Sequence, residues 1–234
     1  MTKETPPPVQ ENKASSLPLL VGFVLIGVLV LAIALVMALR SQLPEPSLTQ
    51  DDSGNLRAGE GIIAVEETPV ALTNFTLPAS TGNDLSLNDL QGKHALVFFG
   101  YSNCPDFCPL TLGEFTQIKG NLGDLGDDLY YVFISVDGER DTPQVLAEYL
   151  ARFDPSFIGL QGNDGVLEPI ANEYHLSYTL NTDERDANNR YTVDHTTSTY
   201  VIDPMGNLVA TISYNSDVES IVAYLEGILT TSAP

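Results

Sequence analysis

Cysteine and histidine are scarce in this chain, which has 234 residues but only two cysteines and three histidines. Two cysteines cannot build a disulfide-stapled scaffold, so the fold must rest on an apolar core. A structural zinc site takes four protein ligands, and so few cysteines and histidines argue against one. The pair, Cys104 and Cys108, also lacks the Cys-x-x-Cys spacing of a dithiol oxidoreductase. A small disulfide, a soft metal site, or a switch between the two is left.

Basic residues are the second shortage. Lys and Arg number 10 against 31 Asp and Glu, which gives a formal net charge of −21. An acidic surface repels nucleic acid and anionic lipid, so we expect no nucleic-acid partner. The charge would suit a basic partner, although solubility alone is the simpler interpretation.

Charge and proline are both absent from residues 19–39. At about 1.5 Å per residue, a helix of this length crosses roughly 30 Å, the hydrocarbon core of a bilayer. The run exceeds the roughly 7–15 apolar residues of a signal peptide and a poor cleavage site follows it, which predicts a retained transmembrane helix. Lys3 and Lys13 precede it and Arg40 alone flanks the far end. This favours a cytoplasmic tail at residues 1–18, with the globular domain on the extracytoplasmic side of the cell membrane.

Residues 40–68 are rich in Pro, Ser, Asp and Gly, which predicts a flexible linker, and the globular domain is expected at residues 69–234. Residues 181–191 are polar and are expected to form a loop. Apolar runs and periodic segments predict strands at 74–77, 84–87, 95–100, 129–136, 157–160, 197–202 and 208–213, and helices at 109–122, 143–153, 165–174 and 218–228. This order predicts an α/β fold whose mixed central sheet is covered on both faces.

The cysteine pair follows the apolar run at residues 95–100 and precedes a predicted helix. The carboxyl end of a buried strand is where α/β sheets usually carry their chemistry. A helix N-terminus favours thiolate over thiol, and the spacing suits either a disulfide or two sulfurs on one metal. Two thiolates suit Cu(I) or Zn(II), and with one imidazole they suit copper better. An incidental buried pair or a structural disulfide remains the alternative.

A third ligand would have to be a histidine. His195 follows a polar loop and precedes a predicted hairpin, so its imidazole could swing over the cysteine loop. His94 is expected at a solvated strand end, and His175 at a helix end. Asp137 ends the strand next to the cysteine strand and could hydrogen-bond His195, or it could merely cap the chain there. Residues 139–141 are expected to form a solvated turn and helix cap.

Three segments taken together resemble the SCO/SenC family of thioredoxin-like copper proteins. They are residues 99–112, which hold both cysteines, residues 134–143, and residues 193–206, which hold His195. The resemblance covers roughly residues 70–230. It implies a thioredoxin-like fold, with copper, as Cu(I) or Cu(II), bound by Cys104, Cys108 and His195.

The resemblance also implies a role in assembling the dinuclear copper centre of cytochrome c oxidase subunit II. The protein would deliver copper, reduce the receiving cysteines, or do both. Delivery predicts a copper chaperone, and reduction predicts an extracytoplasmic thiol–disulfide reductase that depends on an external thiol reductant. In the reductase Cys104 would attack and Cys108 would resolve. A carrier is expected rather than a classical enzyme, with oxidoreductase activity left open.

Two positions depart from the family pattern. Asn103 stands where many members have histidine, and Gly138 stands where many have proline. Neither is a ligand, but Asn103 could alter the polarity of the loop and hence its copper affinity. Tyr101 and Tyr191 are expected to serve packing.

Overall fold

The computed structural model describes residues 29–35, 49–50, 55–58, 61–187, 190–214 and 216–231. The chain divides into two units, Met1–Glu45 and Pro46–Pro234. In the first unit residues 29–35 are helical. Among the described residues, no helix combines the length and apolarity needed to cross a bilayer. Most of the predicted anchor at residues 19–39, and all of the tail at residues 1–18, lie outside the described residues.

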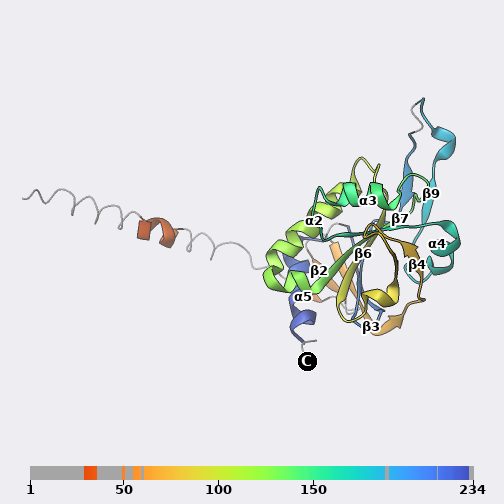
Figure 1. Ribbon diagram of the computed structural model, residues 1–234. Helices are drawn as coiled ribbons and strands as arrows, with labels where there is room; N and C mark the ends of the chain where they lie inside the picture. The colour runs from red at the N-terminus through yellow and green to blue at the C-terminus, as the bar shows by residue number, and fades with distance from the viewer. Residues whose placement is uncertain are drawn as a thin grey trace, which may run out of the picture. The chain divides into compact units, whose positions relative to one another are not determined.

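The second unit is built on a mixed sheet with the strand order β1-β2-β3-β12-β11-β6-β7-β8 (Figure 1). Strands β6, β7 and β8 are parallel, and the other neighbours in this order pair antiparallel. The strands are β1 (Thr49–Gln50), β2 (Leu56–Ala58), β3 (Gly61–Ala71), β6 (His94–Gly100), β7 (Leu129–Ser135), β8 (Ile158–Gln161), β11 (Thr199–Ile202) and β12 (Asn207–Ile212). Two small antiparallel pairs lie outside it: β4 (Thr76–Pro78) with β5 (Asp84–Ser86), and β9 (Tyr178–Leu180) with β10 (Val193–His195).

The helices are α2 (Phe107–Leu122), α3 (Pro143–Leu150), α4 (Asp164–Ile170) and α5 (Val218–Thr231), with 3₁₀ turns η1 (Leu87–Leu90), η2 (Gly123–Asp128) and η3 (Thr182–Glu184). Helix α3 begins where the sequence predicts, because the Thr142 side chain accepts from the backbone N–H of Val145 and Pro143 occupies the first turn.

Aromatic contacts show which face of the sheet α2 and α3 cover. Phe115 of α2 packs on Tyr131, and Tyr149 of α3 packs on Phe133. Alternate residues of a strand share a face, so α2 and α3 cover the same side of β7. Phe99 faces the other side, where its ring meets Tyr174 just beyond α4 and Tyr200 of β11. Every residue of β6 is buried, as expected for a strand inside the sheet.

The predicted order of strands and helices is confirmed for the segment from β4 to α5, apart from the polar segment 181–191. The expectation of a linker at residues 40–68 is wrong for much of its described part: β1 and β2 lie there, and residues 61–68 belong to β3, which pairs with β12. Beyond Ile63 this strand has a described neighbour on one side only, so it is an edge strand there. Edge strands tolerate charged residues and proline, and for this reason the composition of the segment resembled that of a linker. The polar segment 181–191 connects two unexpected short strands, β9 and β10.

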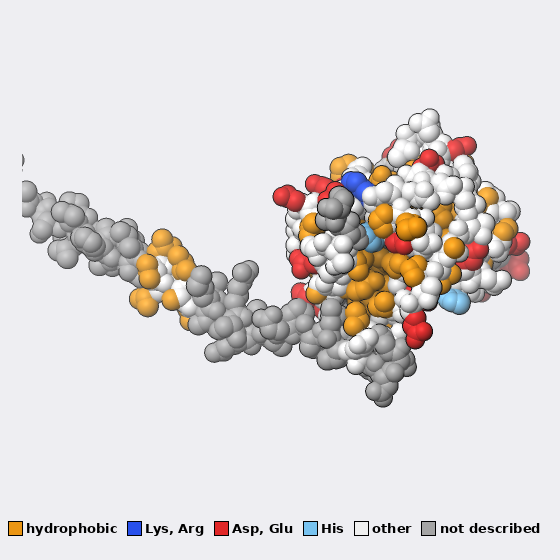
Figure 2. Space-filling model, turned by 90° about the horizontal axis from the view of Figure 1, so that it is seen from below, with side chains coloured by type: hydrophobic (Ala, Val, Ile, Leu, Met, Phe, Trp, Pro, Cys, Tyr) orange, Lys and Arg blue, Asp and Glu red, His pale blue; other side chains and the backbone are white. Residues whose placement is uncertain are grey.

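The surface of the second unit agrees with the composition. Acidic side chains are scattered over the face drawn in Figure 2, and basic ones are few. Apolar side chains gather toward the middle of that face. On this face, the excess of acidic groups in the sequence is therefore visible as exposed acidic side chains.

Candidate metal site

Strand β6 leads directly into the cysteine loop. At its end the carbonyl of Gly100 accepts from the backbone N–H of Val136 at 2.8 Å, which joins the loop to the chain leaving β7. The backbone N–H of Cys104 donates to the Tyr101 carbonyl at 3.2 Å and closes a turn. Helix α2 then begins at Phe107, two residues earlier than predicted. Cys108 therefore lies in the first helical turn.

Gly100 allows α2 to lie close to β6. A Cβ at this position would stand 2.7 Å from the Cys108 sulfur, 2.9 Å from a ring carbon of Phe133 and 3.0 Å from one of Phe98. All these atoms are buried. The buried thiol thus occupies the space that any side chain at residue 100 would need.

The Asp141 carboxylate anchors the cysteine loop through hydrogen bonds. Its carboxylate accepts from the Ser102 backbone N–H at 2.8 Å, from the Ser102 hydroxyl, and from the Ser135 hydroxyl at 2.7 Å. The side chain is fully buried. The expectation of a solvated turn at residues 139–141 is therefore wrong for Asp141, because its partners come from β7 and the cysteine loop. The capping role belongs to Thr142 instead.

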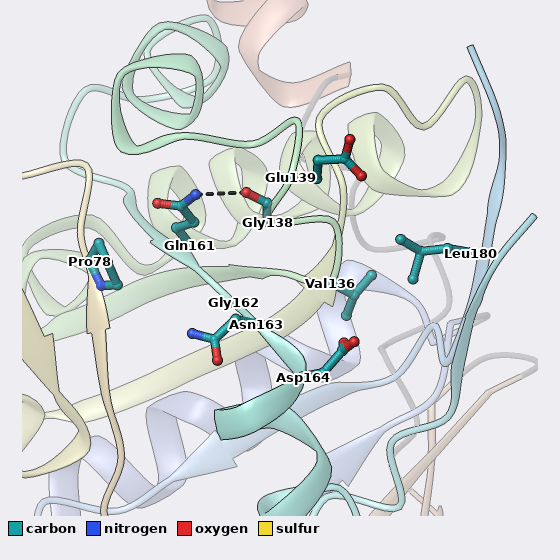
Figure 3. A pocket seen from close by; sticks show the side chains of 9 residues that line it. All are labelled: Pro78, Val136, Gly138, Glu139, Gln161, Gly162, Asn163, Asp164 and Leu180. Carbon is teal, nitrogen blue, oxygen red and sulfur yellow. Dashed lines mark hydrogen bonds between the residues drawn. The ribbon is translucent and has the colours of Figure 1, made fainter. Parts of the chain in front are cut away.

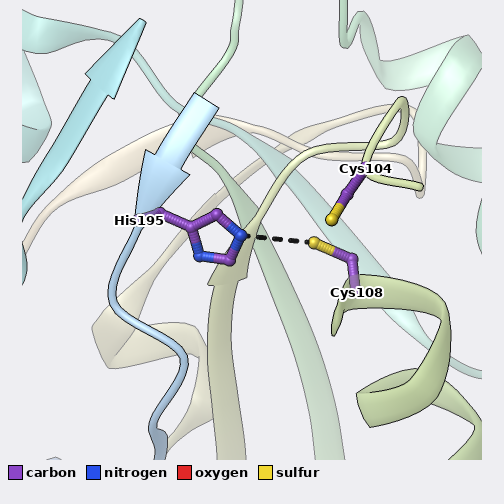
Figure 4. A group of neighbouring side chains, drawn as sticks. All are labelled: Cys104, Cys108 and His195. Atoms are coloured by element: carbon purple, nitrogen blue, oxygen red, sulfur yellow. Dashed lines mark hydrogen bonds between the residues drawn. The ribbon is translucent and has the colours of Figure 1, made fainter. Parts of the chain in front are cut away.

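Cys104, Cys108 and His195 come together at this edge of the sheet. One ligand atom from each lies within 4.8 Å of the others (Figure 4). Both cysteines are free thiols, Cys108 fully buried and Cys104 half-buried. The Nε2 of His195 lies 3.5 Å from the Cys108 sulfur. Two sulfurs and one imidazole thus face a common point.

The other ring nitrogen of His195 sets the tautomer. Its Nδ1 lies 2.9 Å from the carbonyl oxygen of Thr196, which can only accept a hydrogen bond. The proton is therefore assigned to Nδ1, and Nε2 keeps its lone pair toward the sulfurs. The rings of Phe98 and Tyr101 meet the imidazole edge-on at 5.9 and 5.8 Å between centroids.

The two thiols have opposite tendencies to ionise. A hydrogen bond from the Cys108 thiol, together with the backbone N–H groups of Cys108 and Asp106, holds the pKa of Cys104 far below its usual range. Hydrogen bonding to Cys104, followed by burial, raises the pKa of Cys108. The metal-free site therefore holds a half-exposed thiolate beside a buried thiol.

Asp137 does not take the place expected for it. Its buried carboxylate accepts from the Tyr191 hydroxyl at 2.6 Å and pairs with the guanidinium of Arg140. Burial raises the pKa of this carboxyl, while those two partners lower it. Of the two roles considered for Asp137, the hydrogen bond to His195 is wrong, because Tyr191 and Arg140 occupy the carboxylate and the Thr196 carbonyl meets the imidazole Nδ1.

The other two histidines lie outside the site. His94 starts β6 and is buried rather than solvated, and burial lowers its pKa. His175 is exposed just beyond α4 and has a left-handed backbone with φ of 47°. Among the described residues, the group of Cys104, Cys108 and His195 is the one in which three potential metal ligands converge.

A cavity of about 500 Å³ lies beside the turn that follows β7 (Figure 3). Its lining includes Gly138, whose carbonyl accepts from the Gln161 side-chain amide at 2.7 Å. A Cβ on Gly138 would stand 1.8 Å from the Gly162 carbonyl oxygen. This close approach explains why glycine, and not the proline of many family members, stands at residue 138: a proline ring would not fit there.

Comparison with known proteins gives consistent matches. The SCO1/SenC family model matches residues 64–230. The SCO2-like protein of Rickettsia felis is 36% identical over 155 residues, which are 66% of this chain and 75% of that protein. Bradyrhizobium japonicum ScoI with copper bound is 33% identical, with a TM-score of 0.61 over 68% of this chain and 99% of that one.

Yeast Sco1 with copper bound is 31% identical, with a TM-score of 0.64 over 71% of this chain and 92% of that chain. Together with the sheet order, these likenesses confirm the predicted thioredoxin-like α/β fold with a mixed central sheet.

Proposed function

Because the chain belongs to the SCO1/SenC family, we propose that it binds copper through Cys104, Cys108 and His195 and serves the assembly of cytochrome c oxidase. The convergence of these three ligand atoms within 4.8 Å is the observation that carries the proposal. Two thiolates and an imidazole form a soft donor set that suits copper. The copper-bound structures of ScoI and yeast Sco1 support the choice of metal.

Copper is the cargo of this site, and the chain's own groups decide how it is held. The Cys104 thiolate is ready to bind, whereas Cys108 must lose its proton, so binding releases a proton to solvent. His195 presents Nε2 to the metal because its Nδ1 faces a carbonyl. Transfer is ligand exchange: acceptor sulfur or nitrogen atoms form bonds to copper as the bonds to Cys104, His195 and Cys108 break, with no net electron transfer.

The finer features of the role extend the proposal. The acceptor is the dinuclear copper centre of cytochrome c oxidase subunit II, as the family resemblance implies. The apolar run at residues 19–39 anchors the chain in the cell membrane as a single span. The lysines before that run keep the N-terminus cytoplasmic and place the copper domain outside. A thiol reductant on that side keeps both cysteines reduced.

A second function uses the same sulfurs and is favoured by their asymmetry. The half-exposed Cys104 thiolate would attack an acceptor disulfide, forming a mixed disulfide and releasing one acceptor thiolate. Cys108, once deprotonated, would attack the Cys104 sulfur and release the second acceptor thiolate. The acceptor gains two electrons, the chain is left with a Cys104–Cys108 disulfide, and an external dithiol restores it.

Copper binding to the reduced full-length chain tests the proposal. We would titrate it anaerobically, in mild detergent, against a competing Cu(I) chelator. One copper per chain is expected, with weaker binding in Cys104→Ser and His195→Ala and unchanged binding in the control His175→Ala. A wild-type chain that never competes with the chelator would refute the Cu(I) carrier. Disulfide exchange that survives His195→Ala would favour the reductase, which needs no imidazole.

A further inference from the structure

The two kinds of ligand sit on different supports. Both cysteines belong to the continuous β6–loop–α2 segment, which is part of the central fold. His195 lies at the end of β10, which pairs only with β9 in a separate two-stranded ribbon. The distance between the imidazole and the sulfurs therefore depends on how this ribbon is attached to the domain.

Tyr191, just before β10, makes a buried polar attachment. It is 6% exposed, and its hydroxyl donates to Asp137 at 2.6 Å. Its backbone carbonyl accepts from the Arg140 guanidinium at 3.1 Å, and the same guanidinium lies 3.5 Å from the ring centroid. The guanidinium of Arg185 also lies over the ring, at 4.7 Å. Side chain and backbone of Tyr191 are thus both held.

Val193 of β10 is also buried, whereas the other side-chain hydrogen bonds and ion pairs that link the ribbon to the domain are more exposed. The Tyr178 hydroxyl donates to Asp164, and Arg185 pairs with Glu139 at 3.4 Å, both at the surface. Surface ion pairs of this kind contribute little to binding or stability. A hydrogen bond to a buried charged group contributes more, because breaking it leaves the charge without a partner.

The same turn also anchors the cysteine loop. Asp137 and Asp141 lie four residues apart after β7, and the backbone N–H of Asp141 donates to the Asp137 carbonyl at 3.0 Å. Asp141 binds Ser102 of the cysteine loop, while Asp137 binds Tyr191 of the histidine ribbon. One short turn thus connects the two segments that carry the ligands.

We propose that Tyr191, held by Asp137 and Arg140, is a positioning residue that sets His195 against the two thiols. The inference rests on the proposed function, since it concerns the geometry of the copper site. It assigns a role to a tyrosine that touches neither sulfur nor imidazole in the described contacts. It also gives buried Asp137 a part in the site through Tyr191 rather than through the imidazole.

A double-mutant cycle tests the proposal in the full-length chain. Tyr191→Phe keeps the ring and removes only the hydroxyl that binds Asp137. Its Cu(I) affinity should fall by about tenfold or more, the scale of a lost hydrogen bond to a buried charge. In a His195→Ala background the same change should have no effect, because no imidazole remains to be positioned. Equal losses in both backgrounds, or none in either, would overturn the proposal.

Two further measurements keep the outcomes distinct. Tyr130→Phe, at the opposite end of β7, is the matched control and should leave affinity unchanged. In the metal-free chain, the nitrogen and carbon-bound proton NMR signals of the His195 ring should shift and broaden in Tyr191→Phe but not in the control. Unchanged ring signals would refute the positioning role. Failure of the wild-type chain to bind Cu(I) would refute the proposed function and leave the metal-free comparison valid.

Discussion

Replacing Gly100 with alanine should damage the metal site more than it damages the fold. The added Cβ would stand 2.7 Å from the Cys108 sulfur, whereas favourable contacts between heavy atoms lie at about 3.5–4.0 Å. The sulfur must therefore move by about 1 Å, or the helix must move with it. Metal–ligand distances tolerate only about 0.2 Å, so such a displacement disrupts a three-ligand site.

The expected magnitudes separate the two effects. Overpacking of this kind costs about 1–3 kcal/mol of folding free energy, which should leave most molecules folded. The Cu(I) affinity should fall by at least about tenfold, equivalent to about 1.4 kcal/mol of binding free energy. Urea unfolding of the metal-free chain, followed by far-UV circular dichroism because the sequence has no tryptophan, measures the first quantity. Anaerobic competition with a Cu(I) chelator measures the second.

Gly159→Ala provides a matched control. A Cβ there would stand 2.7 Å from the Leu146 Cβ and 2.9 Å from Leu150 Cδ1, between β8 and α3. The steric conflict is similar, but it touches neither thiol. Both variants should lose comparable stability, and only Gly100→Ala should lose copper affinity. If the two variants bind Cu(I) equally well, the argument that Gly100 makes room for the thiol is wrong.

Three shorter predictions concern single groups. Asp141→Asn should lower the free energy of unfolding, measured with urea, by about 2–4 kcal/mol, because the new amide N–H₂ would face hydroxyl and N–H donors. The control Asp106→Asn should change this free energy little, because Asp106 is exposed. The rate of Cys104 alkylation should depend more strongly on pH in a Cys108→Ala chain than in wild type, because the hydrogen bond from Cys108 is the main cause of the lowered pKa of Cys104. Identical pH profiles in the two chains would contradict this. Burial raises the pKa of Glu114, so its carboxylate opposes folding above that pKa and the penalty disappears as the pH falls below the unfolded value. Glu114→Gln should therefore raise the free energy of unfolding at neutral pH and leave it unchanged in acid, which urea unfolding at the two pH values would measure.

Much of the fold could be predicted because it depends on local patterns. The apolar runs of β6 and β7 and the Thr142–Pro143 helix start are properties of neighbouring residues, and they were placed within a residue or two. Strands β9 and β10 have three residues each, too few to show alternation. Most of β3 is an exposed edge with glutamates, so its composition resembles a linker although its backbone pairs with β12.

In the site, too, the features set by local sequence could be predicted and those set by distant residues could not. The cysteines could be placed from the strand–loop–helix pattern, and His195 from its motif. The roles of Asp137 and Asp141 could not, because whether an aspartate is solvated or buried depends on partners far away in sequence. Tyr191 lies 54 residues from Asp137, and Ser102 lies 39 residues from Asp141. Sequence spacing indicates which side chains could bind a metal, but not which buried hydrogen bonds hold them in place.

The differences in burial imply an order for copper transfer under the proposed function. Cys104 and His195 are partly exposed, whereas Cys108, in the first turn of α2, has no exposed surface. An incoming acceptor ligand can therefore reach copper from the side of Cys104 and His195 before Cys108 is accessible. Because the imidazole is held by a separate ribbon, it can be displaced without distorting the segment that carries both sulfurs. Cys108 is then the last ligand to release the metal, and its tendency to regain a proton favours that release.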